Sequence, residues 1–167
     1  MKSPLVSLLI LLISFYLTIT AILFFTQSYF IFFPQEISGN QHSFLKQFKS
    51  NEITLDHDGI SLHGWFIQNE TNPENPLIIY YGGNAEEVSM NLYNLDKFGD
   101  HSLLFMNYRG YGKSEGRPGQ DALFSDALFI FDHISKKYHI PPEKIILKGR
   151  SLGSAVAIHV ASQRKVK

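Results

Sequence analysis

The sequence predicts an α/β fold whose sheet is mostly parallel, with an antiparallel hairpin at its amino-terminal side and one membrane-spanning helix before it. Three observations lead to this fold class. An uncharged apolar run fills residues 5–25, two alternating segments flank an Asp-Gly pair at 58–59, and strand-like and helix-like segments alternate from residue 77 onward. Such alternation is typical of a parallel sheet with helices on its faces.

The apolar run near the amino terminus is long enough to cross a bilayer. Residues 5–25 hold no charge, and residues 30–33 extend the apolar character to Pro34, whereas a span needs about 20 residues. A cleavable signal peptide is the alternative, but its apolar core has about 7 to 15 residues and a small-residue cleavage site, which is absent here. We expect a single-pass anchor over residues 1–34.

After the anchor, the sequence predicts a polar lead-in over residues 35–50 and one α/β domain over residues 51–167. Lys2 precedes the apolar run, and Lys46 and Lys49 follow it, so the flanking positive charges give only a slight preference for orientation. We favour an amino terminus on the inside and an exported body.

Composition excludes several classes of function. The chain has 15 basic and 15 acidic residues and no cysteine, which removes disulfides, thiolate zinc sites and a thiol nucleophile. No basic stripe interleaved with aromatic residues is present, so no nucleic-acid partner is expected. The seven histidines lack a metal-ligand spacing such as His-Glu-x-x-His. We therefore predict no metal and no cofactor.

The domain is predicted to begin with a hairpin. Residues 52–56 and 60–67 alternate on either side of residues 57–59, and Asp-Gly between two such runs is a hairpin signal. A loop rich in asparagine and proline follows over residues 69–76. Residues 77–81 are then continuously apolar, as expected of a strand that is covered on both faces.

The remaining elements follow from apolar spacing and end signals. Val88, Leu92 and Leu95 recur at i, i+4 and i+7, and Gly99 follows the last turn, which indicates a capped helix. The same reasoning predicts helices over residues 86–98, 121–138 and 152–161, and buried strands over residues 102–108 and 144–148.

Residues 149–153 (Gly-Arg-Ser-Leu-Gly) join the last strand to the last helix. Glycines two before and two after Ser151 leave room for a tight strand-to-helix turn that lifts the serine hydroxyl clear of the sheet. The pattern predicts a nucleophile elbow with Ser151 as nucleophile. A glycine-bounded turn without chemistry stays open as the alternative.

A second glycine pair, at residues 82–83, ends the first parallel strand just before Asn84 and Ala85. In an acyl-transfer site, this position supplies one backbone N–H to the oxyanion, and the residue after the nucleophile, here Leu152, supplies the other. An ordinary strand-to-helix turn is the alternative.

The sequence offers no general base for the serine. In hydrolases with this motif the acid and the histidine follow the serine in the chain, but residues 152–167 contain no carboxylate side chain and one histidine, His159. That histidine lies eight residues along the same helix as Ser151, about 12 Å away, whereas proton transfer needs about 3 Å.

Residues 82–85, 107–114 and 149–153 together resemble the α/β-hydrolase superfamily, and more narrowly its membrane-anchored serine-hydrolase branch related to prolyl-oligopeptidase-type peptidases. The three segments occur in the family's order. One departure is Gly82, which stands where many relatives carry histidine. Another is the missing acid and histidine of the triad.

The resemblance implies hydrolysis of an ester, thioester or amide through an acyl-enzyme at Ser151, with a small-molecule or peptide acyl substrate. It implies that Asn84 or Ala85, together with Leu152, offer amides to the oxyanion. Because the resemblance covers the family's first half, we expect a chain truncated after the elbow helix. A membrane-tethered non-catalytic α/β module or pseudoenzyme is the alternative.

Overall fold

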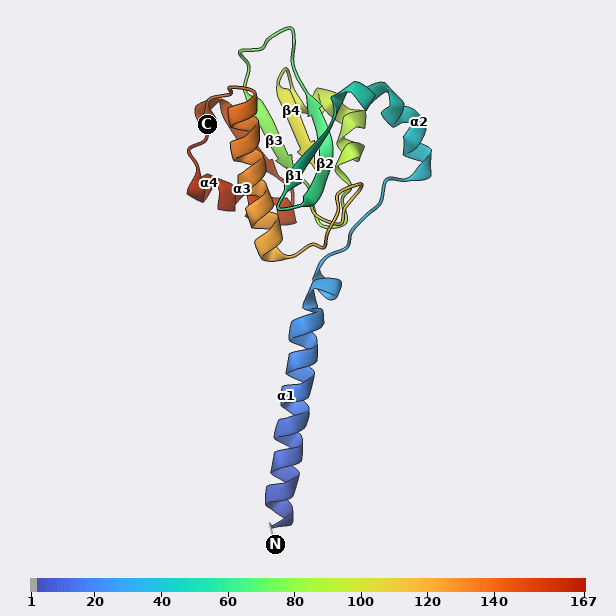
Figure 1. Ribbon diagram of the computed structural model, residues 1–167, viewed down its shortest axis with the longest axis vertical. Coiled ribbons are helices and arrows are strands. Elements are labelled where there is room, and N and C mark those ends of the chain that lie inside the picture. The colour runs from blue at the N-terminus through green and yellow to red at the C-terminus, as the bar shows by residue number, and fades with distance from the viewer. Residues whose placement is uncertain (1–2) are drawn as a thin grey trace. The chain divides into compact units, whose positions relative to one another are not determined.

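The computed structural model describes residues 3–167, and the chain divides into two units, Met1–Phe33 and Pro34–Lys167 (Figure 1). The first unit is the helix α1, Pro4–Ile31, in which no residue is buried. The hydroxyls of Thr18 and Thr26 donate to backbone carbonyls one turn earlier, so these polar groups are satisfied within the helix. By length and composition α1 can cross a membrane, a test that a signal sequence also passes.

The second unit is built on a five-stranded sheet with the order β1-β2-β4-β3-β5. Strand β2 pairs antiparallel with β1 and β4, whereas β3 pairs parallel with β4 and β5. The predicted α/β fold, with a hairpin beside parallel strands, is confirmed. The strands are β1 (Glu52–His57), β2 (Ile60–Ile67), β3 (Leu77–Tyr81), β4 (Ser102–Met106) and β5 (Ile145–Gly149).

A two-residue turn joins β1 to β2. His57 pairs with Ile60, and the intervening Asp58 and Gly59 have φ of 55° and 75°. Positive φ at both central residues is what a type I′ turn requires, and its twist matches that of the flanking strands. The hairpin predicted from the Asp-Gly pair is therefore present.

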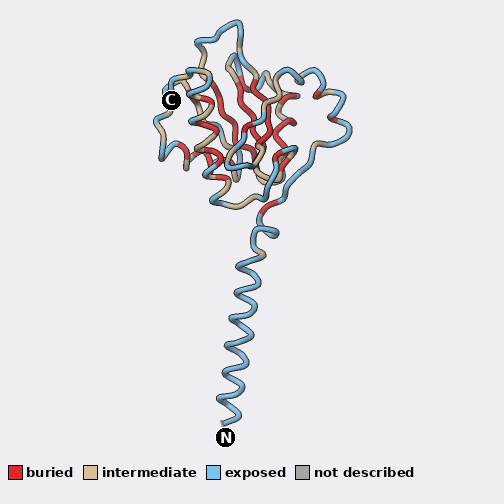
Figure 2. Tube along the Cα trace, viewed as in Figure 1, coloured by how far each residue is buried: buried red, intermediate tan, exposed pale blue. Residues whose placement is uncertain are grey.

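Helices cover both faces of the sheet. On one face α3 (Gln120–Lys137) and α4 (Leu152–Gln163) lie together, and η3 (Val88–Phe98) packs on the other, while η4 (Pro142–Lys144) leads into β5 (Figure 1). Helices α3 and α4 occur where the apolar spacing predicts them. Figure 2 shows the buried residues concentrated on the strands and on the sides of the helices that face them.

The segment predicted as an α-helix over residues 86–98 is instead η3, a 3₁₀ helix with a kink at Asn94. A side-chain bond contributes to the difference, because Asn91 donates to the carbonyl of Val88, which in an α-helix would accept from the amide of Leu92. Glu87 caps the start of η3 by accepting from the amide of Ser89. The predicted end at Gly99 is correct, since this residue has φ of 67°.

One buried cluster fills the space between the sheet and η3. Tyr80 of β3 packs there with Trp65, Val88, Leu92 and Phe105. Because strand side chains alternate, the neighbouring residues of β3 face α3 and α4, and all of β3 is buried. Burying large apolar side chains on both faces supplies the main stabilisation of the domain.

The lead-in packs onto the domain through short helical turns. Leu45 enters the buried cluster, and the carbonyl of Gln35 accepts from the amide of Gly112 at 2.8 Å. The lead-in is thus held at both of its ends. Its turns are η1 (Gly39–Gln41), α2 (His42–Leu45) and η2 (Lys46–Asn51).

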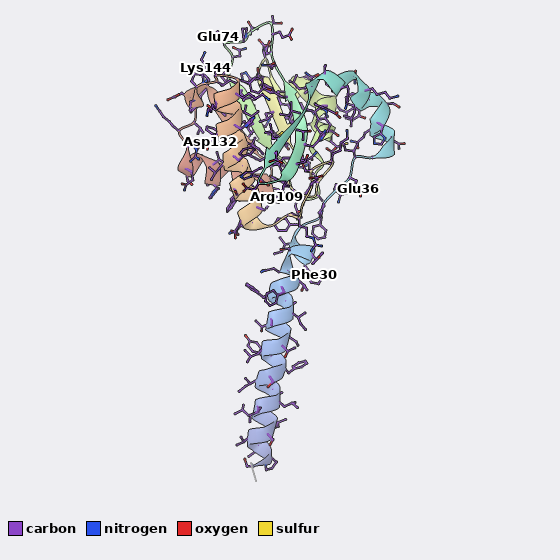
Figure 3. The ribbon with its side chains drawn as sticks, in the orientation of Figure 1. Phe30, Glu36, Glu74, Arg109, Asp132 and Lys144 are labelled. Atoms are coloured by element: carbon purple, nitrogen blue, oxygen red, sulfur yellow. The ribbon has the colours of Figure 1, made fainter. Side chains whose placement is uncertain are left out.

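Asp126 ties α3 to the hairpin and to the loop after β4. Its carboxylate accepts from Nε and Nη2 of Arg109, each at 2.7 Å, and lies 2.7 Å from Nδ1 of His57. The Asp126 side chain is only 5% exposed. Figure 3 labels Arg109 beside the amino-terminal half of α3.

Candidate active site

The predicted elbow joins β5 to α4 through a strained serine. Ser151 has φ of 52° and ψ of −117°, a backbone conformation that side-chain-bearing residues rarely adopt. Ser151 is exposed at the surface. The hydroxyl thus stands at the carboxyl end of β5, at the start of α4, where a nucleophile elbow presents its serine.

Close backbone approaches explain the two glycines of the motif. A Cβ atom at Gly149 would lie 2.3 Å from the carbonyl oxygen of Gly153, and one at Gly153 would lie 2.0 Å from the carbonyl oxygen of Tyr81. Side chains at either position would push α4 away from β5 and β3. The spacing of glycines around Ser151 is therefore required by the packing of this turn.

The loop after β3 lies against the elbow. A Cβ atom at Gly83 would be 3.6 Å from the carbonyl oxygen of Arg150 and 3.8 Å from Cβ of Ser151. The amide of Arg150 donates to the carbonyl of Tyr81 at 3.0 Å. The structure therefore brings together the two segments that the sequence analysis singled out, although 68 positions separate Gly83 from Ser151 in the numbering (151 − 83).

The candidate oxyanion donors lie on these two segments. Leu152 is the first residue of α4, where a helix presents amides without intrahelical partners. Ala85 has φ of 53°. Among the bonds formed by residues 3–167, neither the Ala85 amide nor the Leu152 amide has an acceptor, whereas the Gly83 amide donates to Oε2 of Glu86 at 2.7 Å. The Ala85 and Leu152 amides therefore stay candidates on the two sides, together with the neighbouring Asn84 on the glycine loop.

Two tyrosines of the loop after β4 hold the glycine loop in place. The hydroxyl of Tyr108 donates to the carbonyl of Gly82, and that of Tyr111 donates to Oδ1 of Asn84, each at 2.8 Å. Both tyrosines are buried. The sequence analysis named the segment that carries them but gave them no role, because tyrosine spacing alone does not reveal a contact across strands.

Glu86 contacts both of these segments, although the sequence analysis placed it at the start of a helix. Its carboxylate turns back instead and accepts from the Gly83 amide and from Nη1 of Arg150 at 2.9 Å. Burial would raise the pKa of Glu86, but hydrogen bonds from Asn91, the Gly83 amide, Tyr80 and Arg150 hold it below its usual value. The carboxylate is therefore ionised at neutral pH.

A general base beside the serine is not found within residues 3–167. The Ser151 hydroxyl has no hydrogen-bond partner among them. His159 stacks on the ring of Phe124, with centroids 4.1 Å apart. In the same described part of the chain, no group of three histidines or carboxylates is arranged to hold a metal ion.

A cavity of about 400 Å³ opens beside the candidate oxyanion loop. Its walls come from the lead-in, from the start of η3 and from the elbow, and they include Gln41, Ala85, Met90 and Arg150. A space of this size next to Ala85 can take part of a small-molecule substrate.

The sequence is similar to several curated proteins, although no protein-family model matches it. The "Alpha/beta hydrolase domain-containing protein WAV2" of Arabidopsis thaliana is 36% identical over 103 residues, which are 59% of this chain and 33% of the plant protein. An uncharacterized membrane protein of Saccharomyces cerevisiae is 37% identical over 114 residues, 66% of this chain and 39% of the yeast protein. The chain thus spans little more than a third of the length of these relatives.

Solved structures share the fold of the second unit. An alpha-beta hydrolase from Vibrio vulnificus superposes with a TM-score of 0.66 at 22% identity, over 78% of this chain and 49% of that one. An esterase from Pyrococcus furiosus gives a TM-score of 0.60 at 20% identity, over 80% of this chain and 52% of its own. Because the sequence identities are this low, these similarities show a shared fold and nothing further.

Proposed function

Because this chain has the fold of the α/β-hydrolase superfamily and is similar in sequence to it, we propose that it carries the nucleophile half of a serine-hydrolase site. The observation that carries the proposal is Ser151, which has a positive φ and an exposed position at the end of β5. The loop after β3 lies beside it, since a Cβ atom added at Gly83 would be 3.8 Å from Cβ of Ser151. An ordinary turn needs neither a strained serine nor a second loop beside it.

The proposed reaction is acyl transfer to Ser151 from an ester, thioester or amide of a small molecule or peptide. The serine Oγ attacks the carbonyl carbon, and the developing oxyanion accepts hydrogen bonds from the amides of Leu152 and of Ala85 or Asn84. The tetrahedral intermediate collapses to the acyl-enzyme as the alcohol, thiol or amine leaves with a proton, and water then releases the acid.

A serine hydroxyl is a weak nucleophile unless a base takes its proton. Since residues 3–167 hold no hydrogen-bond partner for the Ser151 hydroxyl, the proposal assigns the base and its acid to groups outside these residues. The half-length match to hydrolase structures supports this assignment.

For the first unit we propose a single-pass membrane anchor with the second unit on the exported side. The uncharged, 28-residue α1 supports the anchor, and the yeast relative is named a membrane protein. The orientation rests on the flanking lysines alone.

The proposed nucleophile is tested by labelling the full chain in nanodiscs with a fluorophosphonate probe and mapping the adduct by mass spectrometry. Added imidazole supplies a base in solution, so we expect it to speed labelling of Ser151 by about tenfold or more. Ser151→Ala should abolish the adduct, and Ser154→Ala, which removes an exposed serine three residues further on, should retain it. Absence of a Ser151 adduct at saturating imidazole would contradict the proposal.

A membrane-tethered non-catalytic module is the second candidate function. The unpartnered Ser151 hydroxyl favours it within the described residues 3–167. If the chain is such a module, we expect it to fold as described and Ser151 to form no adduct. The same labelling experiment therefore separates the two candidates.

A further inference from the structure

One side chain joins the glycine loop after β3 to the serine elbow. Oε1 of Glu86 accepts from the Tyr80 hydroxyl and from Nδ2 of Asn91, each at 2.9 Å. Oε2 accepts from the Gly83 amide at 2.7 Å and from Nη1 of Arg150 at 2.9 Å. The four donors come from the end of β3, the loop, η3 and the elbow. A carboxylate with all of its acceptor sites in use fixes the relative position of its donors.

The charge of this carboxylate has a second consequence. An ionised group bonded to the loop that carries Ala85 would oppose the negative charge that develops on the proposed oxyanion, because Coulomb repulsion is strong outside bulk water. Arg150 offsets it, since its guanidinium pairs with Glu86 while remaining 69% exposed. The Glu86 side chain is only 9% exposed. Solvent therefore screens its negative charge poorly, and the positive charge of Arg150 does more to offset it.

Burial and the bond to Glu86 raise the pKa of the Tyr80 hydroxyl, which therefore stays protonated and remains a donor. The Gly83 amide is consumed by the same carboxylate. By binding this amide, Glu86 fixes the loop that carries Ala85.

We propose that Glu86 is a positioning residue that clamps the glycine loop to the elbow through Gly83 and Arg150, so that the Ala85 and Leu152 amides point to one oxyanion. The effect of this clamp on the oxyanion donors rests on the proposed function. The clamp itself, the set of bonds that Glu86 makes to Gly83 and Arg150, does not. Nothing in the motif pattern requires a carboxylate at position 86, and the assignment comes from its four bonds.

The clamp is tested first without reference to activity, by hydrogen exchange of the full chain in nanodiscs. In Glu86→Gln we expect exchange to rise about tenfold in the peptides that cover residues 82–86 and 149–153 and to stay unchanged in α3, because local openings report local contacts. Arg150→Met should give a smaller increase in the same peptides, and Arg150→Lys should restore part of the protection. Glu74→Gln is the matched control, since Glu74 is 88% exposed and pairs with Lys144 on the surface.

Unchanged exchange of both segments in Glu86→Gln, or an equal increase in α3, would overturn the clamp. Because Arg150 is exposed, its variants decide the question even if Glu86→Gln fails to fold. In the second measurement, Ser151 labelling of the same preparations, Glu86→Gln should lower the maximal rate about tenfold and leave the half-saturating probe concentration within about twofold. Equal maximal rates would remove the positioning role. A wild-type chain that never labels would remove the proposed function, while the exchange result still decides the clamp.

Discussion

At the scale of single residues, ionised side chains at the edge of the domain define how its stability depends on pH. Glu52 of β1 accepts a hydrogen bond from Lys113 at 2.8 Å and one from Lys49, and it lies 3.6 Å from Nε2 of His63. Burial acts to raise the pKa of Glu52, but the two lysines outweigh it and lower the pKa from 4.5 to about 2.

A carboxyl whose pKa is depressed on folding stabilises the protein above its unfolded pKa and loses that contribution as pH falls through its folded value. The Glu52 contribution should thus be complete above pH 4.5 and disappear towards pH 2. Because the lysines are largely in solvent, we expect about 1 kcal/mol. Urea unfolding of the full chain in detergent at pH 5.5 and pH 3 should show this loss in the wild type and less of it in Glu52→Gln. Identical pH dependence of both proteins would refute the assignment.

At the scale of elements, the sequence predicted each strand and the helices α1, α3 and α4, because apolar runs, Asp58-Gly59 and the elbow glycines act locally. Segment 86–98 was mistaken for an α-helix because neither the bond from Asn91 to the Val88 carbonyl nor the kink at Asn94 can be read from apolar spacing. The roles of Glu86 and Tyr108 were missed for a related reason. Arg150 lies 64 residues from Glu86, and Gly82 lies 26 residues from Tyr108, so only the folded sheet brings each of these pairs together.

The approach of α4 to β3 gives a prediction for Gly153. A Cβ atom there would meet the carbonyl oxygens of Tyr81 and Gly82 at 2.0 and 2.6 Å, and backbone cannot move aside as a side chain can. We expect Gly153→Ala to lower the free energy of unfolding by about 2 to 3 kcal/mol, measured by urea denaturation. Gly39→Ala, where a Cβ atom meets nothing within 4 Å, should change it by less than about 0.5 kcal/mol. Equal stability of the two variants would mean that the helix does not pack this closely.

The attachment of α3 to the hairpin gives a prediction for Asp126. Asp126→Asn keeps the shape but removes the charge that Arg109 and His57 face in a buried setting, and we expect a loss of about 3 kcal/mol in the free energy of unfolding. The matched change Asp132→Asn breaks a surface pair with Arg164, whose side chains are 51% and 34% exposed, and should cost less than about 1 kcal/mol. Figure 3 labels Asp132 on the side of α3 toward α4. A similar cost for both changes would argue against the buried cluster.

At the scale of the whole molecule, the two units have separate physical tasks. In α1 no residue is buried, so its apolar side chains need a bilayer or another cover to leave water. The second unit buries its own core. Carbonate extraction of membranes should leave the full chain in the pellet and release residues 34–167 into the supernatant. Recovery of the intact chain in the soluble fraction, or a mature amino terminus near residue 26, would favour a signal peptide.

The central proposal is that this fold presents Ser151 as a nucleophile whose base and acid lie outside residues 3–167. It is tested most directly by a chimera in which the chain continues into the carboxyl-terminal half of the Arabidopsis relative, labelled with a fluorophosphonate probe beside the chain alone. Loss of a triad member in serine proteases leaves only the residual catalysis of oxyanion hole and binding. We therefore expect the chain alone to label slowly and the chimera to label Ser151 about a hundredfold faster or more, with no adduct in Ser151→Ala. A folded chimera that forms no adduct at Ser151 would contradict the account.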